Sequence, residues 1–168
     1  MPTQLGIDLG ATKIAAALYD PSGLLLKTES IPTDASEGAE AVLKRVAGFA
    51  ERMRMPDTDA IGVGVPGLID REGIVHTMPN IPGGEGMCFG EVLRTATGLR
   101  VEVDNDANCF ALAEALHGAG TGSLIVVGVT LGTGVGGGIV INGALLRGSR
   151  GFAGEIGHML LQPGHPPF

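Results

Sequence analysis

Apolar residues in the first part of the chain occur in short runs that turn-forming residues separate. Runs at 6–9, 14–19 and 24–31 are joined by a glycine turn at Gly10 and by the sequence DPSG at 20–23. Short apolar runs punctuated in this way are typical of antiparallel strands. The pattern therefore predicts three strands joined as a meander.

The rest of the chain alternates between helical and strand patterns. Apolar residues of 36–54 recur at steps of three and four, which predicts a helix that Ser36 or Asp34 caps and Pro56 ends. We then expect strand 60–65, hairpin 69–78, loop 79–86, helix 88–97, strand 100–104, helix 106–117, and strands 123–130 and 135–141. Strands alternating with helices after an antiparallel start predict an α/β class with a mixed sheet.

Glycine is unusually abundant, with 29 residues in 168, which favours tight turns and close approach of backbone to a ligand. Residues 118–146 carry no charge and are long enough to span a bilayer. Ten of them are glycine, however, and would make a poor helix. Two buried strands around a glycine turn are therefore expected, and no membrane span.

The charge and the cysteine content limit the partners and the compartment. A net charge of −7 provides no basic surface for nucleic acid or for anionic membranes. Cys88 and Cys109 are too few for a disulfide framework or a metal site of their own, so a cytoplasmic location is expected. The N-terminal sequence lacks the basic start and the long apolar core of a signal peptide.

Two glycine-rich turns follow predicted strands. GIDLGATK at 6–13 places Asp8 at a strand end and exposes backbone amides, Thr12 and Lys13, a combination that suits phosphate oxygens and a hydrated Mg²⁺. LGTGVGGG at 131–138 again offers amides and a hydroxyl. The glycine spacing of the first turn matches neither a Walker A loop nor a dinucleotide fingerprint. Ordinary hairpins without a ligand remain the alternative for both turns.

Two further motifs carry polar side chains. A strand ends at Asp104, and NDAN at 105–108 opens a helix, so these residues are helix caps or else Asp106 accepts a proton from a substrate hydroxyl. In GEIGH at 154–158, Glu155 and His158 suit hydroxyl recognition or metal ligation, although a solvated histidine is the simpler interpretation.

Six motifs together resemble the ROK family of sugar kinases and sugar-responsive repressors, and within it the bacterial glucokinases: GIDLGATK, VGVPGLID (62–70), PNIPG (79–83), NDANCFALAE (105–114), LGTGVGGGIV (131–140) and GFAGEIGH (151–158). The resemblance implies an actin/hexokinase-like (ribonuclease H-like) fold with a mixed sheet. It implies a first α/β domain at 1–116 and, at 117–168, the beginning of a second domain that stops at Phe168.

The resemblance also implies ATP-dependent phosphorylation of a hexose, usually on the 6-hydroxyl, by a cytoplasmic homodimer, with Asp106 as general base and Asp8 near Mg²⁺. It assigns the phosphates to two loops: Gly10, Thr12 and Lys13, and Gly132, Thr133 and Gly134. It assigns sugar contacts to Gly67, Asn80, Asn105, Asp106, Glu155 and His158. His158 also matches a structural zinc ligand, whose cysteine partners would lie beyond this chain.

Several alternatives stay open. The family's PNIPG loop usually continues with tryptophan, whereas Gly84 and Glu85 follow here. Glucose, mannose, fructose and N-acetylated sugars are not distinguished, and neither are ATP and polyphosphate as donors. A repressor would carry a helix-turn-helix before Asp8, where no room is expected. We expect residues 1–168 alone to be inactive, because half a cleft cannot enclose a sugar.

Overall fold

The computed structural model describes residues 2–132 and 134–159. The chain divides into two compact units, Met1–Asp106 and Ala107–Phe168, and each unit is described by itself. The predicted α/β class with a mixed sheet is confirmed. The predicted domain division between residues 116 and 117 stays a prediction.

The first unit is built on a five-stranded mixed sheet in the order β3-β2-β1-β4-β7. β1, β2 and β3 form the predicted antiparallel meander, whereas β4 and β7 extend the sheet from β1 in parallel. The strand bounds are Thr3–Leu9 for β1, Lys13–Tyr19 for β2, Leu25–Pro32 for β3, Thr58–Val65 for β4 and Arg100–Asn105 for β7.

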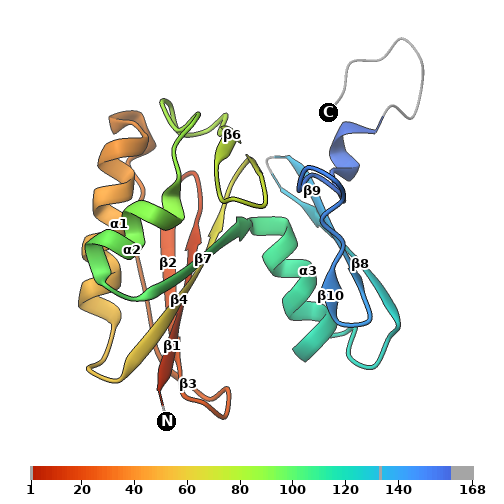
Figure 1. Ribbon diagram of the computed structural model, residues 1–168, viewed down its shortest axis with the longest axis horizontal. Helices are drawn as coiled ribbons and strands as arrows, with labels where there is room; N and C mark the ends of the chain where they lie inside the picture. Colours follow the sequence, from red (N-terminus) through yellow and green to blue (C-terminus); the bar gives the residue numbers. More distant parts are fainter. Residues whose placement is uncertain (1, 133, 160–168) are drawn as a thin grey trace. The chain divides into compact units, whose positions relative to one another are not determined.

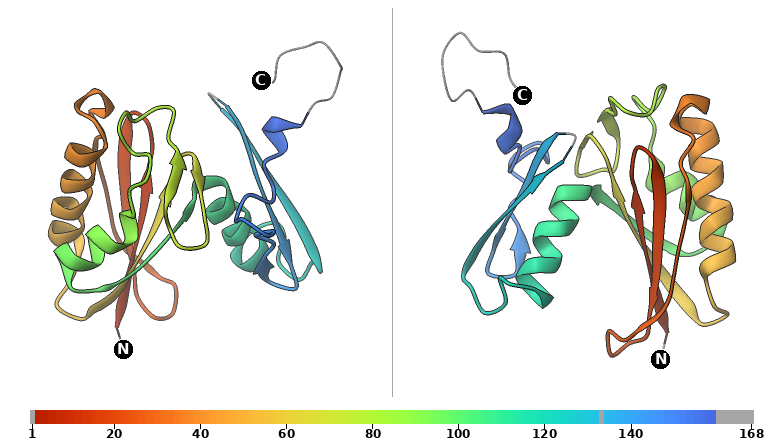
Figure 2. Two further views of the ribbon diagram at one scale, coloured as in Figure 1. Left: turned by 45° about the horizontal axis from the view of Figure 1, so that its top comes forward. Right: turned by 180° about the vertical axis from the view of Figure 1, so that it is seen from behind.

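Two helices, α1 (Ala39–Met53) and α2 (Phe89–Thr97), lie along one face of this sheet (Figures 1 and 2). Burial alternates along β1 and β2, because every second side chain enters the core beneath the helices. The core combines these side chains with the apolar stripe of α1: Leu5, Ile7, Leu9, Ile14, Ala16, Leu18, Val42, Leu43, Val46, Phe49 and Ala50.

The predicted start of the first helix is wrong. Residues 35–37 form a separate 3₁₀ turn, and α1 begins after Gly38, with no side-chain capping bond. Asp34 adopts a left-handed backbone with φ 50° instead of capping α1. The helix ends at Met53, before Pro56, as expected.

Between β4 and α2 the chain makes the predicted hairpin and loop. β5 (Leu68–Ile69) pairs with β6 (Val75–Thr77), and residues 79–86 contain no helix or strand. This segment precedes α2, whose predicted range 88–97 is confirmed to within one residue.

The second unit contains α3 (Asp106–His117), whose first residue closes the first unit, and an antiparallel sheet in the order β10-β9-β8. The strands are β8 (Ile125–Leu131), β9 (Val135–Ile141) and β10 (Ala144–Leu145), followed by a 3₁₀ turn, η2 (Ile156–His158). The two strands predicted from the uncharged stretch are thus present. The predicted burial is wrong for β8, because every second side chain along this strand is exposed. Within the described residues, no helix is long and apolar enough to cross a membrane.

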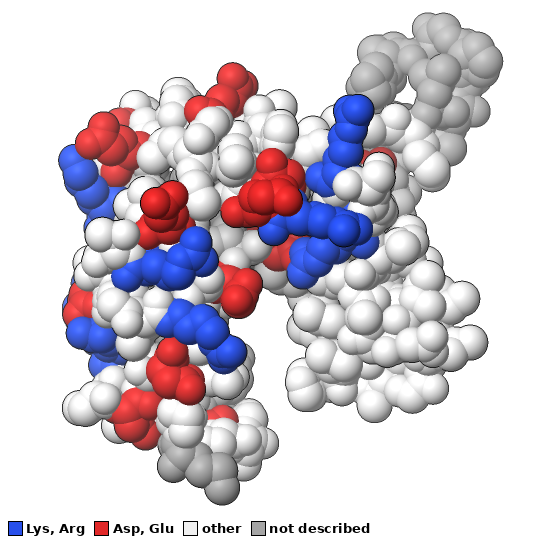
Figure 3. Space-filling model, in the orientation of Figure 1, with Lys and Arg blue, Asp and Glu red and all other residues white. Residues whose placement is uncertain are grey.

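α3 packs on one face of this sheet, and the side chains on the other face of β8 are exposed. Ile125, Val127, Val129 and Leu131 are 57%, 54%, 45% and 81% exposed. The space-filling view shows no charged side chain over this uncharged part of the second unit (Figure 3).

Candidate functional site

The carboxyl ends of β1, β4 and β7 meet at one edge of the sheet in the first unit. Asp8 of β1 is in register with Gly64 of β4, which is in register with Asp104 of β7. Neighbouring strands lie about 4.8 Å apart, so the backbones of Asp8 and Asp104 are separated by about 10 Å. Asn105 ends β7, and Asp106 follows directly as the first residue of α3. The fold therefore brings Asp8, Asn105 and Asp106 to the same sheet edge.

Asp8 is the carboxylate nearest to the first glycine turn. Loss of solvation raises the pKa of its carboxyl group above the ordinary value, and the ammonium group of Lys13 opposes this shift. Asp8 still has an exposed surface. An exposed carboxylate beside backbone amides is a hard oxygen donor, which fits Mg²⁺ that keeps most of its water ligands.

The first glycine turn connects β1 to β2. The Gly10 N–H donates to the Lys13 carbonyl at 2.9 Å, and a Cβ on Gly10 would lie 2.9 Å from that same oxygen. Glycine is required here by this close approach of backbone to backbone. Ala11, Thr12 and Lys13 are all exposed. The turn therefore presents amides, a hydroxyl and an ammonium group to solvent.

Asn105 and Gly67, two residues predicted to contact a sugar, are joined by a hydrogen bond. The Asn105 side-chain amide donates to the Gly67 carbonyl at 2.9 Å, across the end of β4. Gly67 has φ 108°, and a Cβ there would collide with the Thr77 carbonyl oxygen. Only glycine fits this backbone. The hydrogen bond to the Gly67 carbonyl gives the Asn105 side chain a fixed orientation at the sheet edge.

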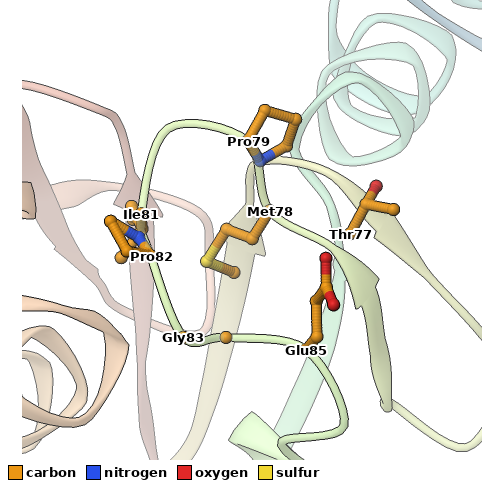
Figure 4. Close-up of a pocket in the computed structure, with 8 residues that line it drawn as sticks. Thr77, Met78, Pro79, Ile81, Pro82, Gly83 and Glu85 are labelled. Carbon is orange, nitrogen blue, oxygen red and sulfur yellow. The ribbon is translucent and has the colours of Figure 1, made fainter.

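The PNIPG loop borders a hollow of about 560 Å³ lined by Thr77, Met78, Pro79, Ile81, Pro82, Gly83, Gly84 and Glu85 (Figure 4). Asn80 lies in this loop and is exposed. Ile81 is fully buried, and the Pro82 carbonyl accepts from the Ala39 N–H at the start of α1, so the loop is anchored to the core.

Gly84 directly follows PNIPG, where the resemblance led us to expect tryptophan. A Cβ on Gly84 would lie 3.2 Å from the Met78 sulfur and 3.5 Å from the Ala39 Cβ. The first atom of a side chain at this position would therefore contact Met78 and Ala39.

The second glycine turn connects β8 to β9. The Gly132 N–H donates to the Gly134 carbonyl at 2.9 Å, while Thr133 lies outside the described residues. Glycines 136–138, which the sequence pattern grouped with this turn, have a different role. A Cβ on Gly138 would lie 2.7 Å from the Ala111 Cβ, and one on Gly137 would lie 2.7 Å from the Gly154 carbonyl. These glycines allow α3 and residues 154–158 to pack closely on β9.

Glu155 and His158 lie beside the start of β9. A Cβ on Gly157 would collide with the Val135 carbonyl oxygen, so this segment packs directly against the strand that leaves the second turn. The Glu155 carboxylate and the His158 Nε2 are 3.9 Å apart, and their side chains are 28% and 67% exposed. This geometry leaves both groups accessible to a hydroxylated ligand.

The residues described here contain no group of three or more metal-ligating side chains. A structural zinc needs four ligands, and Glu155 and His158 would supply two at most. The described residues alone do not form a zinc site.

Comparison with known proteins places these motifs in context. Residues 4–167 match the ROK family. The chain is 40% identical over 164 residues to a glucokinase from Thermotoga maritima, covering 96% of this chain and 52% of that protein. It thus spans about half the length of the curated relatives it matches.

Solved structures of ROK family proteins are also similar to this chain. A ROK family glucokinase from Streptomyces griseus in complex with glucose and AMPPNP has a TM-score of 0.85 at 36% identity, covering 96% of this chain and 51% of that one. A ROK family transcriptional regulator, homologue of the E. coli MLC protein, has a TM-score of 0.85 at 29% identity, covering 98% and 43%. The expected actin/hexokinase-like fold is confirmed.

Proposed function

Because the chain belongs to the ROK family, we propose that the complete protein is an ATP-dependent kinase that phosphorylates glucose on its 6-hydroxyl. The observation that carries the proposal is the edge of the first sheet, where Asp8 lies near the end of β1, Asn105 ends β7 and Asp106 begins α3. Phosphoryl transfer needs little covalent chemistry from a protein. It needs a positioned base, and donors that hold the phosphates, which this edge and the adjacent glycine turn offer.

Asp106 is the proposed general base. Its carboxylate accepts the proton of the 6-hydroxyl while the hydroxyl oxygen attacks the γ-phosphorus. The new oxygen–phosphorus bond forms as the bond to the β-phosphate oxygen breaks, and ADP leaves. Asp106 is the first residue of α3, where the partial positive charge of a helix N-terminus favours an ionised carboxylate.

The remaining assignments rest on the resemblance and on the local geometry of each unit. We assign phosphate binding to Gly10, Thr12 and Lys13 in the first unit and to Gly132, Thr133 and Gly134 in the second. Sugar contacts are assigned to Gly67, Asn80, Asn105, Glu155 and His158. A magnesium ion held through Asp8 would place positive charge opposite the phosphate oxygens.

Three further features belong to the same proposal. The protein acts as a homodimer in the cytoplasm, and a structural zinc binds His158 together with cysteines outside this chain. The accessible histidine beside Glu155 supports the zinc assignment, and chelation followed by metal analysis of the full-length protein tests it.

The kinase proposal is tested with the full-length protein, Mg-ATP and a panel of glucose, mannose, fructose and N-acetylated hexoses. Asp106→Ala should lower turnover by about 10² to 10⁴, the usual contribution of a positioned base. The control is Asp59→Asn, an exposed carboxylate at the start of β4, which should leave turnover unchanged. Absence of any phosphorylated hexose, or an unaffected Asp106→Ala variant, would refute the proposal.

A second candidate is a sugar-responsive regulator, which the similarity to the transcriptional regulator supports. The net charge of −7 argues against direct DNA binding by these residues. Retention of the full-length protein on a DNA column at physiological salt, without kinase activity, would favour the regulator.

A further inference from the structure

The turn between β1 and β2 is held from behind by one buried residue, Thr33, which follows β3. Thr33 is fully buried. Its hydroxyl donates to the Gly10 carbonyl at 2.7 Å, and its backbone N–H donates to the Thr12 carbonyl at 3.0 Å. One residue therefore satisfies two carbonyl groups of the turn.

Arg45 of α1 holds Thr33 in turn. Its guanidinium donates to the Thr33 carbonyl at 2.5 Å and to the Glu37 carboxylate at 2.7 Å, and it lies 3.6 Å from Asp34. The N–H, hydroxyl and carbonyl groups of Thr33 are therefore all hydrogen-bonded, the first two to the turn and the third to Arg45. The turn is thereby tied to α1, an element of the core.

These bonds determine which way the turn's amides point. In a trans peptide the C=O and N–H groups point in opposite directions. Fixing the Gly10 carbonyl toward Thr33 therefore turns the Ala11 N–H away from it, and fixing the Thr12 carbonyl does the same for the Lys13 N–H. Within the described part of the chain, the Ala11 N–H donates no hydrogen bond. It is left available to an anion.

We propose that Thr33, held by Arg45, is a positioning residue for nucleotide binding: it touches no ligand, and it pre-orients the Gly10–Lys13 turn toward the phosphates. This inference rests on the proposed function. Pre-orientation reduces the ordering cost on binding, so losing it weakens the binding of the nucleotide but not of the sugar.

The first test uses steady-state kinetics of the full-length protein. Thr33→Val keeps the shape and removes the hydroxyl, and should raise the KM for ATP about 3- to 10-fold, as expected for one hydrogen bond, with the hexose KM unchanged. Thr33→Ser should restore the wild-type value. The control is Thr28→Val, because the Thr28 hydroxyl in β3 likewise donates to a backbone carbonyl, that of Ala16 in β2, away from the turn. An unchanged KM for ATP, or equal rises for both substrates, overturns the proposal.

The second test needs no kinase activity, so it separates this inference from the proposed function. The Gly10 N–H is bonded to the Lys13 carbonyl, and its hydrogen exchange reports the order of the turn. Exchange should be faster in Thr33→Val and in Arg45→Met, and unchanged in Thr28→Val. Wild-type exchange in both of the first two variants overturns the positioning role even if the full-length protein phosphorylates no sugar.

Discussion

Asp8 occupies a site that disfavours its own charge. Loss of solvation raises the pKa of its carboxyl, and the ammonium group of Lys13 opposes the shift. Perturbed carboxyl groups of this kind gather at functional sites, although structural ones exist too. Asp20, in the exposed turn between β2 and β3, is the opposite case. Hydrogen bonds from the Ser22 side chain and from the Leu24 backbone lower its pKa.

Asp8→Asn should lower kinase activity without lowering the thermal stability of the fold. A raised pKa means that folded Asp8 holds a proton at pH values where the unfolded carboxyl has lost it, so stability falls as pH rises through that window. Removing the charge should therefore leave the Tm at pH 7 equal to or above the wild-type value. The difference should vanish near the ordinary pKa of about 3.9, and kinase activity of the full-length protein should fall.

The control for this experiment is Asp20→Asn. Its lowered pKa stabilises the fold above the ordinary pKa, so this variant should lose Tm at pH 7 and match the wild type in acid. Thermal unfolding from pH 7 down to well below the ordinary aspartate pKa of about 3.9 measures both variants. A lower Tm for Asp8→Asn at pH 7 would contradict the assigned cause.

At the residue scale, the sequence motifs marked candidate site residues, and the roles of these residues stay predictions. Gly67 and Asn105 were both proposed as site residues, and the structure joins them by a hydrogen bond. Thr33 was missed because nothing in its neighbourhood marks it. Its partner Gly10 lies 23 residues earlier, and a threonine between Pro32 and Asp34 is an ordinary loop residue by pattern.

At the scale of elements, β9 is defined by what packs on it. Its glycines bring α3 onto one side and residues 154–158 onto the other, with Ala111 and Ile156 as the nearest side chains. The sequence showed one glycine-rich string, LGTGVGGG. Periodicity cannot tell a glycine that exposes amides from one that accepts a neighbouring helix, so the two roles separate only in the structure.

Gly138→Val tests the packing role. The added side chain would begin 2.7 Å from the Ala111 Cβ and 3.0 Å from the Ala107 carbonyl. Overpacking at such a contact should destabilise the full-length protein by about 1–3 kcal/mol in urea unfolding. Gly134→Val is the matched control, since no atom of the described residues outside its chain neighbours lies within 4 Å of a Cβ there. Equal stability of the two variants would argue against this account of β9.

The strand order is a second feature that the sequence did not reveal. Each strand of the first sheet was predicted, but the parallel pairing of β1 with β4 joins residues more than fifty positions apart. The pairing of β1 with β4 and the pairing of β4 with β7 together align Asp8, Gly64 and Asp104. Apolar periodicity reports which residues face a core and carries no information on which strand lies beside which.

At the scale of the whole molecule, the 168 residues match about half of the length of related kinases. We expect this chain by itself to release no ADP in a hexose-dependent manner, because it covers only about half of the length of the matched enzymes. A coupled ADP assay measures this, with the full-length protein in the same buffer as the positive control. Hexose-dependent ADP release by residues 1–168 would contradict the expectation.

The bare face of β8 determines how such a chain behaves at high concentration. Ile125, Val127 and Val129 are each at least 45% exposed on a strand at the edge of the described sheet, and such strands recruit further copies edge to edge. Light scattering by purified residues 1–168 should therefore grow with concentration. Val127→Lys combined with Val129→Lys should suppress it, whereas lysines at the exposed Thr121 and Ser123 should not. The exposed apolar side chains of β8 therefore make this strand a site where copies of the chain aggregate.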